Sequence, residues 1–164
     1  LRETDVISAK WMEAALEMVQ NDYDYCIIDT RPAFENIAGS AILAANMLLT
    51  PVCLDKFCRD NLALVDDFLR EMPSELRPEW KVFANKLDPN RRAQRSIYMD
   101  LVERHDYPFL DTCISRGAVV DNALEQYKPV MRHRTKSSVA QDYMDLAGEI
   151  IEIPGAGGQE NGEV

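Results

Sequence analysis

Four short apolar runs, separated by segments with helical periodicity, limit the folds open to this chain more than any other feature. The runs cover residues 25–28, 47–54, 80–85 and 109–114. Continuous apolar runs of this length are typical of strands buried on both faces, as in a parallel sheet. We therefore expect an α/β fold with three layers, in which a parallel sheet of about four strands is flanked by helices.

The segments around these runs predict the helices. Apolar residues recur at three- and four-residue spacing over residues 7–20, 37–45, 56–72, 91–105, 118–127 and 137–151. We expect residues 1–153 to form one domain, a length that can bury a substantial core. Residues 154–164 are rich in Gly and carry Glu160 and Glu163, which predicts a disordered tail.

The composition excludes several classes of protein. Hydrophobic residues make up 46% and charged residues 28% of the chain, which is typical of a globular protein. No apolar run reaches the roughly 18 residues of a membrane span, and the first residues lack the features of a signal peptide. The four Cys form no CxxC pair and there are two His, so no zinc site is expected. We expect reduced thiols and a cytoplasmic location.

Polar residues follow the predicted strands. Asp29, Asp55, Asn85 and Arg116 each lie at or just after the end of an apolar run. In open parallel sheets, ligands bind at the carboxyl ends of the strands. The sequence therefore predicts a binding site at this edge of the sheet.

The first of these runs has the pattern of a Walker B motif, an apolar strand that ends in an acid. Asp29 in this position can hold a Mg²⁺ ion or its water beside the phosphates of a nucleotide. An Asp that only caps the next turn gives the same pattern, so the motif alone leaves both roles open. Arg31 can pair either with a phosphate or with Asp29, and the sequence does not decide between them.

The order of several segments resembles the ParA/MinD family of P-loop ATPases. Residues 23–32, YDYCIIDTRP, resemble the family's YDYIIIDtPP segment, and residues 41–52 resemble the helix and strand that follow it. Residues 114–130 resemble the family's IPR turn and the next helix, and residues 141–150 resemble its last helix. The chain departs from the family at Arg31 and Ser115, where the family has Pro. The resemblance runs from about Trp11 to Ile151.

The resemblance implies roles at the nucleotide site. Asp29 matches the catalytic Walker B acid, which holds Mg²⁺ through water, whereas Asn85 and Arg116 match positions that contact the nucleotide base. The implied cofactors are ATP and Mg²⁺ in the intact protein. From the residues alone, Asn85 as a turn cap and Arg116 as a solvated loop residue are equally open.

The resemblance also implies partners. Members of the family dimerise with ATP, bind DNA without sequence preference, and work with an adaptor in plasmid or chromosome partitioning. Arg132, Arg134 and Lys136 lie in the region that contacts DNA, although a solvated loop also explains this basic segment. The net charge of −10 argues against nucleic-acid binding over the rest of the surface. The chain lacks the basic amphipathic C-terminal helix of MinD, so we expect no membrane binding.

No Gly-rich lysine loop, the element that cradles phosphates in P-loop ATPases, occurs in the 164 residues. In the family this loop precedes the region that the chain matches, on a strand in the middle of the sheet. The chain is therefore either part of a longer protein or a nucleotide-free relative, and we expect the chain alone to bind ATP and Mg²⁺ weakly and to hydrolyse no ATP. Without that strand, an edge of the sheet is expected to be exposed, through which the chain can dimerise.

Two other functions remain open. Residues 85–88, Asn-Lys-Leu-Asp, match the NKxD motif of GTPases, in which the Asp accepts hydrogen bonds from guanine. A non-catalytic interaction module, derived from the same fold, also agrees with the acidic composition, the missing phosphate loop and the exposed sheet edge.

Overall fold

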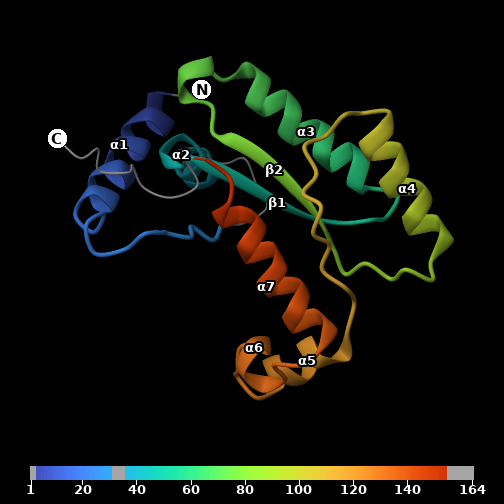
Figure 1. Cartoon of the computed structure of the whole chain (residues 1–164). Coiled ribbons are helices and arrows are strands. Elements are labelled where there is room, and N and C mark those ends of the chain that lie inside the picture. The colour runs from blue at the N-terminus through green and yellow to red at the C-terminus, as the bar shows by residue number, and fades with distance from the viewer. Residues whose placement is uncertain (1–2, 31–35, 155–164) are drawn as a thin grey trace. The chain divides into compact units, whose positions relative to one another are not determined.

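The computed structural model describes residues 3–30 and 36–154, in which two helices precede a β–α–β unit and four helices follow it (Figure 1). These residues form two compact units. Of the described residues, the first contains residues 3–30, 36–48, 67–79 and 153–154, and the second contains Leu49–Asp66 and Trp80–Glu152. The elements are α1 Glu3–Glu17, α2 Asn36–Ala44, β1 Met47–Cys53, α3 Cys58–Glu71, a 3₁₀ helix Ser74–Leu76, β2 Glu79–Asn85, α4 Arg92–Glu103, α5 Ala118–Glu125, α6 Val130–His133 and α7 Ser138–Ile151.

β1 and β2 form a parallel pair connected through α3 (Figure 1). The N–H of Glu79 donates to the carbonyl of Asn46 over 2.9 Å, so the two strands begin side by side. The indole N–H of Trp80 donates to the hydroxyl of Thr50 over 3.0 Å across the same pair. The α/β class with a parallel sheet, predicted from the apolar runs, is confirmed.

The fourth predicted strand, residues 109–114, runs beside β2 as an irregular partner. Parallel bridges join Val82 to Phe109 and Leu87 to Ser115, so six steps along this segment match five steps from β2. An extra residue of this kind disrupts the ladder locally, as in a β-bulge. The segment is therefore attached to β2 by separate bridges rather than by a continuous strand.

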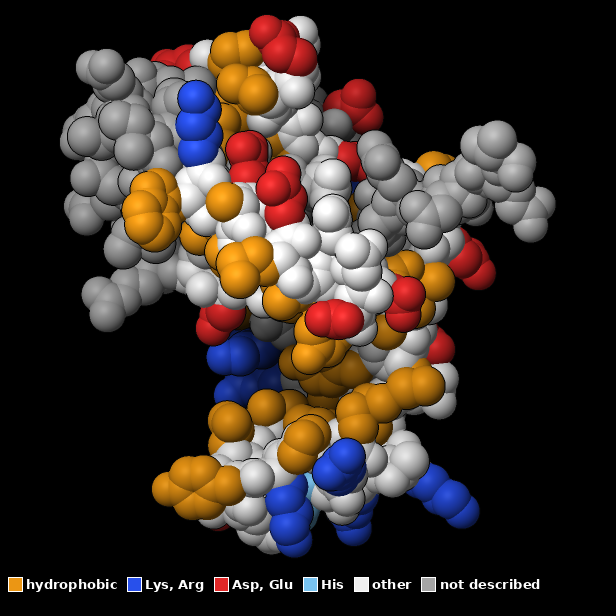
Figure 2. Space-filling model, turned by 90° about the vertical axis from the view of Figure 1, so that its left-hand side faces the viewer, with side chains coloured by type: hydrophobic (Ala, Val, Ile, Leu, Met, Phe, Trp, Pro, Cys, Tyr) orange, Lys and Arg blue, Asp and Glu red, His pale blue; other side chains and the backbone are white. Residues whose placement is uncertain are grey.

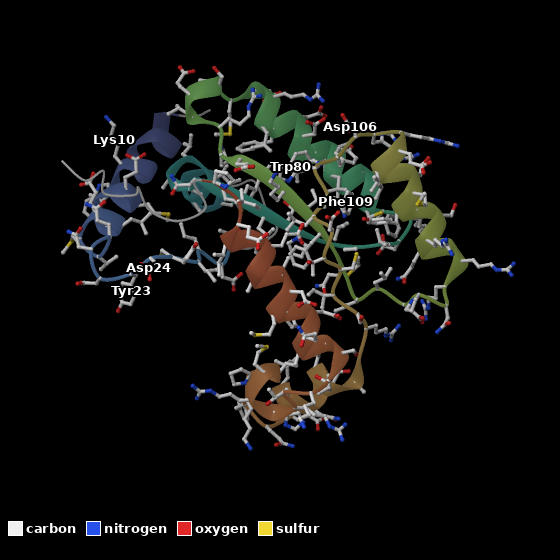
Figure 3. The ribbon with its side chains drawn as sticks, viewed as in Figure 1. Lys10, Tyr23, Asp24, Trp80, Asp106 and Phe109 are labelled. Atoms are coloured by element: carbon white, nitrogen blue, oxygen red, sulfur yellow. The ribbon has the colours of Figure 1, made fainter. Side chains whose placement is uncertain are left out.

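The strand predicted at residues 25–28 is wrong. Residues 25–30 have no regular secondary structure, and the side chain of Ile27 is 93% exposed. Tyr23 and Asp24 just before them also lie at the surface (Figure 3). A strand needs a neighbouring backbone to pair its N–H and C=O groups. The described residues therefore contain two strands and one irregular partner instead of about four strands.

The core of the second unit lies around β2. Val82 and Ala84 of β2 pack with Leu62 of α3 and Leu101 of α4, all of them essentially inaccessible to solvent. Aromatic side chains surround this cluster, among them Trp80 and Phe109 (Figure 3). Phe109 meets Tyr98 edge to face with 5.2 Å between ring centroids, and Trp80 meets Tyr107 at 5.7 Å. Such edge contacts add to the stabilisation from burial.

The predicted helices are confirmed, with ends that differ by a few residues from the periodicity. In the first unit α1 contacts α2, whose Ala38, Ala41 and Ile42 are buried. In the second unit Ser137 caps α7, because its hydroxyl accepts from the N–H of Ala140. Within residues 3–30 and 36–154, no helix combines the length and the apolar character needed to cross a bilayer. Arg31 and the tail from residue 155 lie outside the described residues.

Candidate functional site

Asn85 and Arg116 stand at neighbouring ends in the second unit. Asn85 is the last residue of β2, and Arg116 directly follows the bridge between Leu87 and Ser115. The N–H of Leu87 donates to the carbonyl of Ile114, and the N–H of Arg116 donates to the carbonyl of Leu87, both over 2.9 Å. The structure thus brings together two of the predicted site residues that are 31 positions apart in the numbering.

The turn after β2 explains why an Asn stands at position 85. Its Oδ1 accepts a hydrogen bond of 2.9 Å from the N–H of Lys86, and Lys86 has a positive φ of 55°. The side chain of Asn85 is half-buried and also carries two N–H donors. A turn cap and a base contact therefore use different atoms of this side chain, and its role toward a nucleotide stays a prediction. Arg116 is exposed, so its guanidinium is accessible from solvent.

Asp88, the acid of the NKxD match, serves the turn that leads into α4. Its Oδ1 accepts from the N–H of Asn90 over 3.1 Å, and its Oδ2 pairs with Nε of Arg91 at 3.5 Å. Its own N–H donates to Oε1 of Gln94 over 2.8 Å. A guanine base would need the same carboxylate oxygens as acceptors. These contacts disfavour the GTPase hypothesis.

Asp29 lies in the first unit on the irregular segment, and its side chain is exposed. Its predicted place at the tip of a buried strand is therefore wrong, because no strand precedes it. Protein-bound Mg²⁺ is usually held by one or two carboxylates together with phosphates and waters. Across the described residues, no three His, Cys, Asp or Glu side chains are grouped as a metal site requires. A Mg²⁺ ion held through one carboxylate and a nucleotide needs no such group, so the role of Asp29 stays a prediction.

Asp55 follows β1 in the turn that leads into α3. Its Oδ1 accepts a hydrogen bond of 2.8 Å from the N–H of Phe57, and its carbonyl accepts from the N–H of Cys58. An Asp side chain that accepts from the N–H two residues on forms an Asx turn. The geometry of Asp55 is that of a structural turn residue.

The basic segment 128–136 includes α6 and the turn after it. Arg132, Arg134 and Lys136 are all exposed, and no acid interrupts the segment. Figure 2 shows Lys and Arg side chains gathered at the bottom of the view, beside hydrophobic side chains. The accessibility that a DNA contact requires is present, while DNA binding itself stays a prediction.

Two carboxylates of α7 were missed by the sequence analysis. Glu149 accepts from the N–H groups of Asp111 and Thr112 over 2.7 and 2.9 Å, and Asp142 accepts from the N–H of Ser115 over 2.8 Å. They accept hydrogen bonds from backbone N–H groups that a continuous strand would have paired with its neighbour. Their spacing of seven residues, which places both on one face of a helix, is the signal that could have revealed them.

The surroundings of these carboxylates change two pKa values. Burial raises the pKa of the Cys113 thiol, and the charges of Asp142 and Glu149 raise it further. Burial also works to raise the pKa of Glu149, but the hydrogen bonds from Thr112 and Asp111 outweigh it, so that pKa lies below its usual value. Cys113 is therefore a protonated structural thiol, because nucleophilic cysteines need a lowered pKa.

Comparisons with known proteins agree with the earlier resemblance. A family model described as AAA domain, AAA_31, matches residues 3–82. The ParA family protein pGP5-D of the Chlamydia psittaci virulence plasmid is 28% identical over 88% of this chain and 55% of its own length. The sporulation initiation inhibitor protein Soj of Bacillus subtilis is 26% identical over 85% of this chain and 56% of its own length.

Two further similarities concern partition proteins. The chromosome partitioning protein ParA of Caulobacter vibrioides is 24% identical over 84% of this chain and 53% of its own length. A plasmid partition protein from Borrelia burgdorferi superposes with a TM-score of 0.48 at 16% identity, over 82% of this chain and 53% of that one.

The second unit contains a parallel pair of strands with polar residues at its carboxyl edge. Together with this arrangement, the matches support a relation of the chain to ParA-type P-loop ATPases. The chain spans about half the length of the curated relatives it matches.

Proposed function

We propose that this chain is the carboxy-terminal part of the nucleotide-binding domain of a ParA-type ATPase that acts in plasmid or chromosome partitioning. The intact protein would bind ATP, form homodimers, contact DNA without sequence preference and work with a partition adaptor in the cytoplasm. The name of the relative from Caulobacter vibrioides supports the partitioning role, and that of the relative from Chlamydia psittaci supports the ParA type. The chain itself would supply the base-contacting edge and the DNA-contacting segment.

The observation that carries this proposal is the junction of β2 with the segment that ends at Arg116. The hydrogen bond from Arg116 N–H to the Leu87 carbonyl holds Arg116 next to the turn that begins at Asn85. The amide of Asn85 and the guanidinium of Arg116 are suited to contact the polar edge and the face of an adenine base.

The nucleotide test uses the protein expressed from its complete reading frame and a fluorescent ATP analogue. We expect Asn85→Ala and Arg116→Ala each to weaken binding by about tenfold, as the loss of one good hydrogen bond or cation contact predicts. Arg104→Ala is the matched control, because Arg104 is exposed directly after α4 and pairs with Asp100. Equal affinities of the three variants would contradict a base site at this edge. Stronger competition by GTP than by ATP would favour the GTPase hypothesis instead.

The chain as it stands lacks a Gly-rich lysine loop, so we expect no phosphate release from Mg-ATP. A phosphate-release assay with the 164-residue chain checks this expectation. Turnover that survives further purification would refute it.

The DNA test measures fluorescence anisotropy with two labelled duplexes of unrelated sequence, in the protein expressed from its complete reading frame. We expect similar affinity for both duplexes and a steep loss of affinity with salt, because each phosphate contact adds about 0.9 to the slope of log K against log salt. The triple variant of Arg132, Arg134 and Lys136 to Glu should bind at least about tenfold more weakly. A control triple variant of Lys10, Lys56 and Arg59 to Glu has the same net charge and changes exposed residues elsewhere. An equal loss in both variants would show that total charge, rather than this segment, governs binding.

A further inference from the structure

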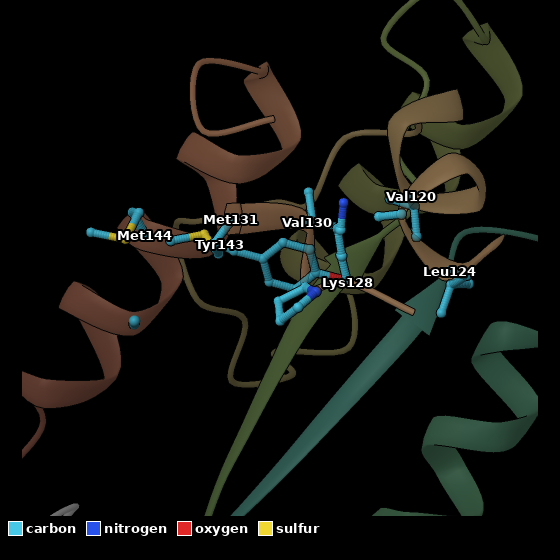
Figure 4. Close-up of a pocket in the computed structure, with 10 residues that line it drawn as sticks. Val120, Leu124, Lys128, Val130, Met131, Tyr143 and Met144 are labelled. Carbon is cyan, nitrogen blue, oxygen red and sulfur yellow. The ribbon is translucent and has the colours of Figure 1, made fainter. Parts of the chain in front are cut away.

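Three helices of the second unit enclose an apolar groove. Its volume is about 530 Å³, and α5, α6 and α7 all contribute to its walls (Figure 4). Residues from α5 and α7 enter it at helical spacing, so each helix turns one face toward the groove. The lining residues are Val120, Ala123, Leu124, Lys128, Pro129, Val130, Met131, Tyr143, Met144 and Ala147.

Large apolar side chains in this α5–α7 groove remain uncovered. Leu124 is 68% exposed and Met144 is 54% exposed. Contiguous exposed apolar surface is unusual on a soluble domain and marks interaction sites. Met131 and Met144 add flexible, polarizable side chains, which are common where a surface must adapt to a partner.

The charge at the groove is opposite to that of the chain as a whole. Lys128 is the one charged residue among those that line the groove, and Figure 4 shows it between the α5 side and the α7 side. Arg132, Arg134 and Lys136 continue the basic segment directly after the lining residues. The chain as a whole has a net charge of −10. A ligand that fits this surface therefore combines an apolar face with negative charge.

We propose that the α5–α7 groove is a docking site for an amphipathic helix of a partner protein, a helix whose apolar face is flanked by Asp and Glu. An amphipathic helix that lays its apolar face into a groove is a recurrent mode of recognition. The acidic flanks would meet Lys128 and the cations that follow it, which steers the encounter and fixes the orientation. The proposal rests on the groove and on Lys128, and does not depend on nucleotide binding. Arg132, Arg134 and Lys136 are also the proposed DNA contacts, so DNA and the partner's helix would compete for them.

Two other occupants agree less well with the groove. A second copy that approached with the same surface would bring cations against cations, which is unfavourable. A lipid surface is bound by helix faces that project into it, whereas these apolar side chains line a concavity.

The test measures binding of synthetic peptides to the 164-residue chain by fluorescence anisotropy. The probe is a labelled 18-residue helical peptide, a length of about five turns, with Leu at i, i+3, i+4 and i+7 positions and Glu on both flanks. A peptide of scrambled order and one with Lys in place of every Glu serve as controls. We expect saturable binding of the acidic amphipathic peptide and at least about tenfold weaker binding of both controls.

Variants of exposed residues locate the binding site. Leu124→Glu and Lys128→Glu should each weaken binding of the acidic peptide by about tenfold or more. Lys128→Glu should also reduce the preference for the peptide with Glu over the peptide with Lys. Leu64→Glu is the matched control, because Leu64 is 58% exposed on α3 and does not line the groove. Circular dichroism of each variant confirms that its helices are retained.

Several results would overturn the proposal. These are equal binding of the scrambled or Lys peptide, a loss in Leu64→Glu as large as in Leu124→Glu, and binding to anionic vesicles but not to the acidic peptide. A dimer of the chain, seen by analytical ultracentrifugation, that Leu124→Glu abolishes would assign the groove to self-association and overturn it as well.

Discussion

The segment that ends at Asp29 and the segment that ends at Asn85 have similar sequences but different structures. Both are short apolar runs followed by a polar residue. Residues 80–85 form a buried strand, with Val82 and Ala84 inaccessible to solvent, while residues 25–28 form no strand and leave Ile27 93% exposed. Residues 80–85 pair with β1 and with residues 108–115, whereas residues 25–28 have no strand beside them in the described residues.

This difference shows that an apolar run favours the strand conformation, but forms a strand only where a neighbouring backbone pairs with it. β propensity chiefly measures packing against cross-strand neighbours, and a strand without a partner leaves its N–H and C=O groups to water. Asn85 therefore occupies a defined position, whereas Asp29 does not.

Hydrogen exchange gives the largest contrast. The N–H of Val82 donates to the carbonyl of Pro108 and that of Leu110 donates to the carbonyl of Val82, both within the core. We expect these amides to exchange at least about 1,000-fold more slowly than those of residues 26–28, because core amides open only at a cost near the global stability. Mass spectrometry of deuterated peptides measures this. Strong protection of residues 26–28 would mean that they pair with another backbone in solution.

Truncation of one apolar side chain in each region comes next. Leu101→Ala should lower the free energy of unfolding by about 3 kcal/mol, because Leu101 is fully buried against β2 and leaves a cavity. Ile27→Ala should change it by less than about 0.5 kcal/mol, as for other exposed sites. Urea titration of both variants measures the free energy of unfolding. An equal loss in Ile27→Ala and Leu101→Ala would contradict the difference between the two segments.

A methyl group added at Gly117 tests how tightly α7 packs against the residue that follows Arg116. A Cβ there would lie 2.7 Å from Cγ2 of Val139, a buried side chain on α7. We expect Gly117→Ala to cost about 1–2 kcal/mol, since a branched side chain in a packed core cannot easily move aside. The same substitution in a Val139→Ala background should cost less. An equal cost in both backgrounds would assign the effect to the backbone rather than to this contact.

The pH dependence of Glu149 gives the smallest effect. Its pKa is lowered from 4.5 in the folded chain, so its stabilisation is present above that pH and is lost as the pH falls through the lower folded value. Glu149→Gln should destabilise the chain by about 1 kcal/mol at neutral pH, and this difference should shrink in acid. Urea titrations at several pH values measure it, with the exposed Glu17→Gln as control. A difference that stays constant with pH would show that the contact does not depend on the charge of Glu149.

The comparison also shows which parts of the site could be predicted. Helical periodicity located α3, α4, α5 and α7 to within a few residues, because each buries one face and exposes the other. The position of Asn85 followed from the same pattern, since its strand lies between two helices and has neighbours on both sides. The strand at residues 25–28 could not be settled in this way, because its partner is not encoded in its own periodicity.

Sequence alone determined the α/β class, the parallel direction of the strands and the basic segment around Arg132, because these depend on local pattern and composition. Only the tertiary structure decided that Arg116 is held beside the turn at Asn85, that Asp88 is occupied by its own turn, and that α5, α6 and α7 leave a groove between them. These features join residues that lie far apart in the chain or depend on the direction of single hydrogen bonds. A pattern of residue types does not specify which distant residues meet or which way a hydrogen bond points, so these features are known only from the folded structure.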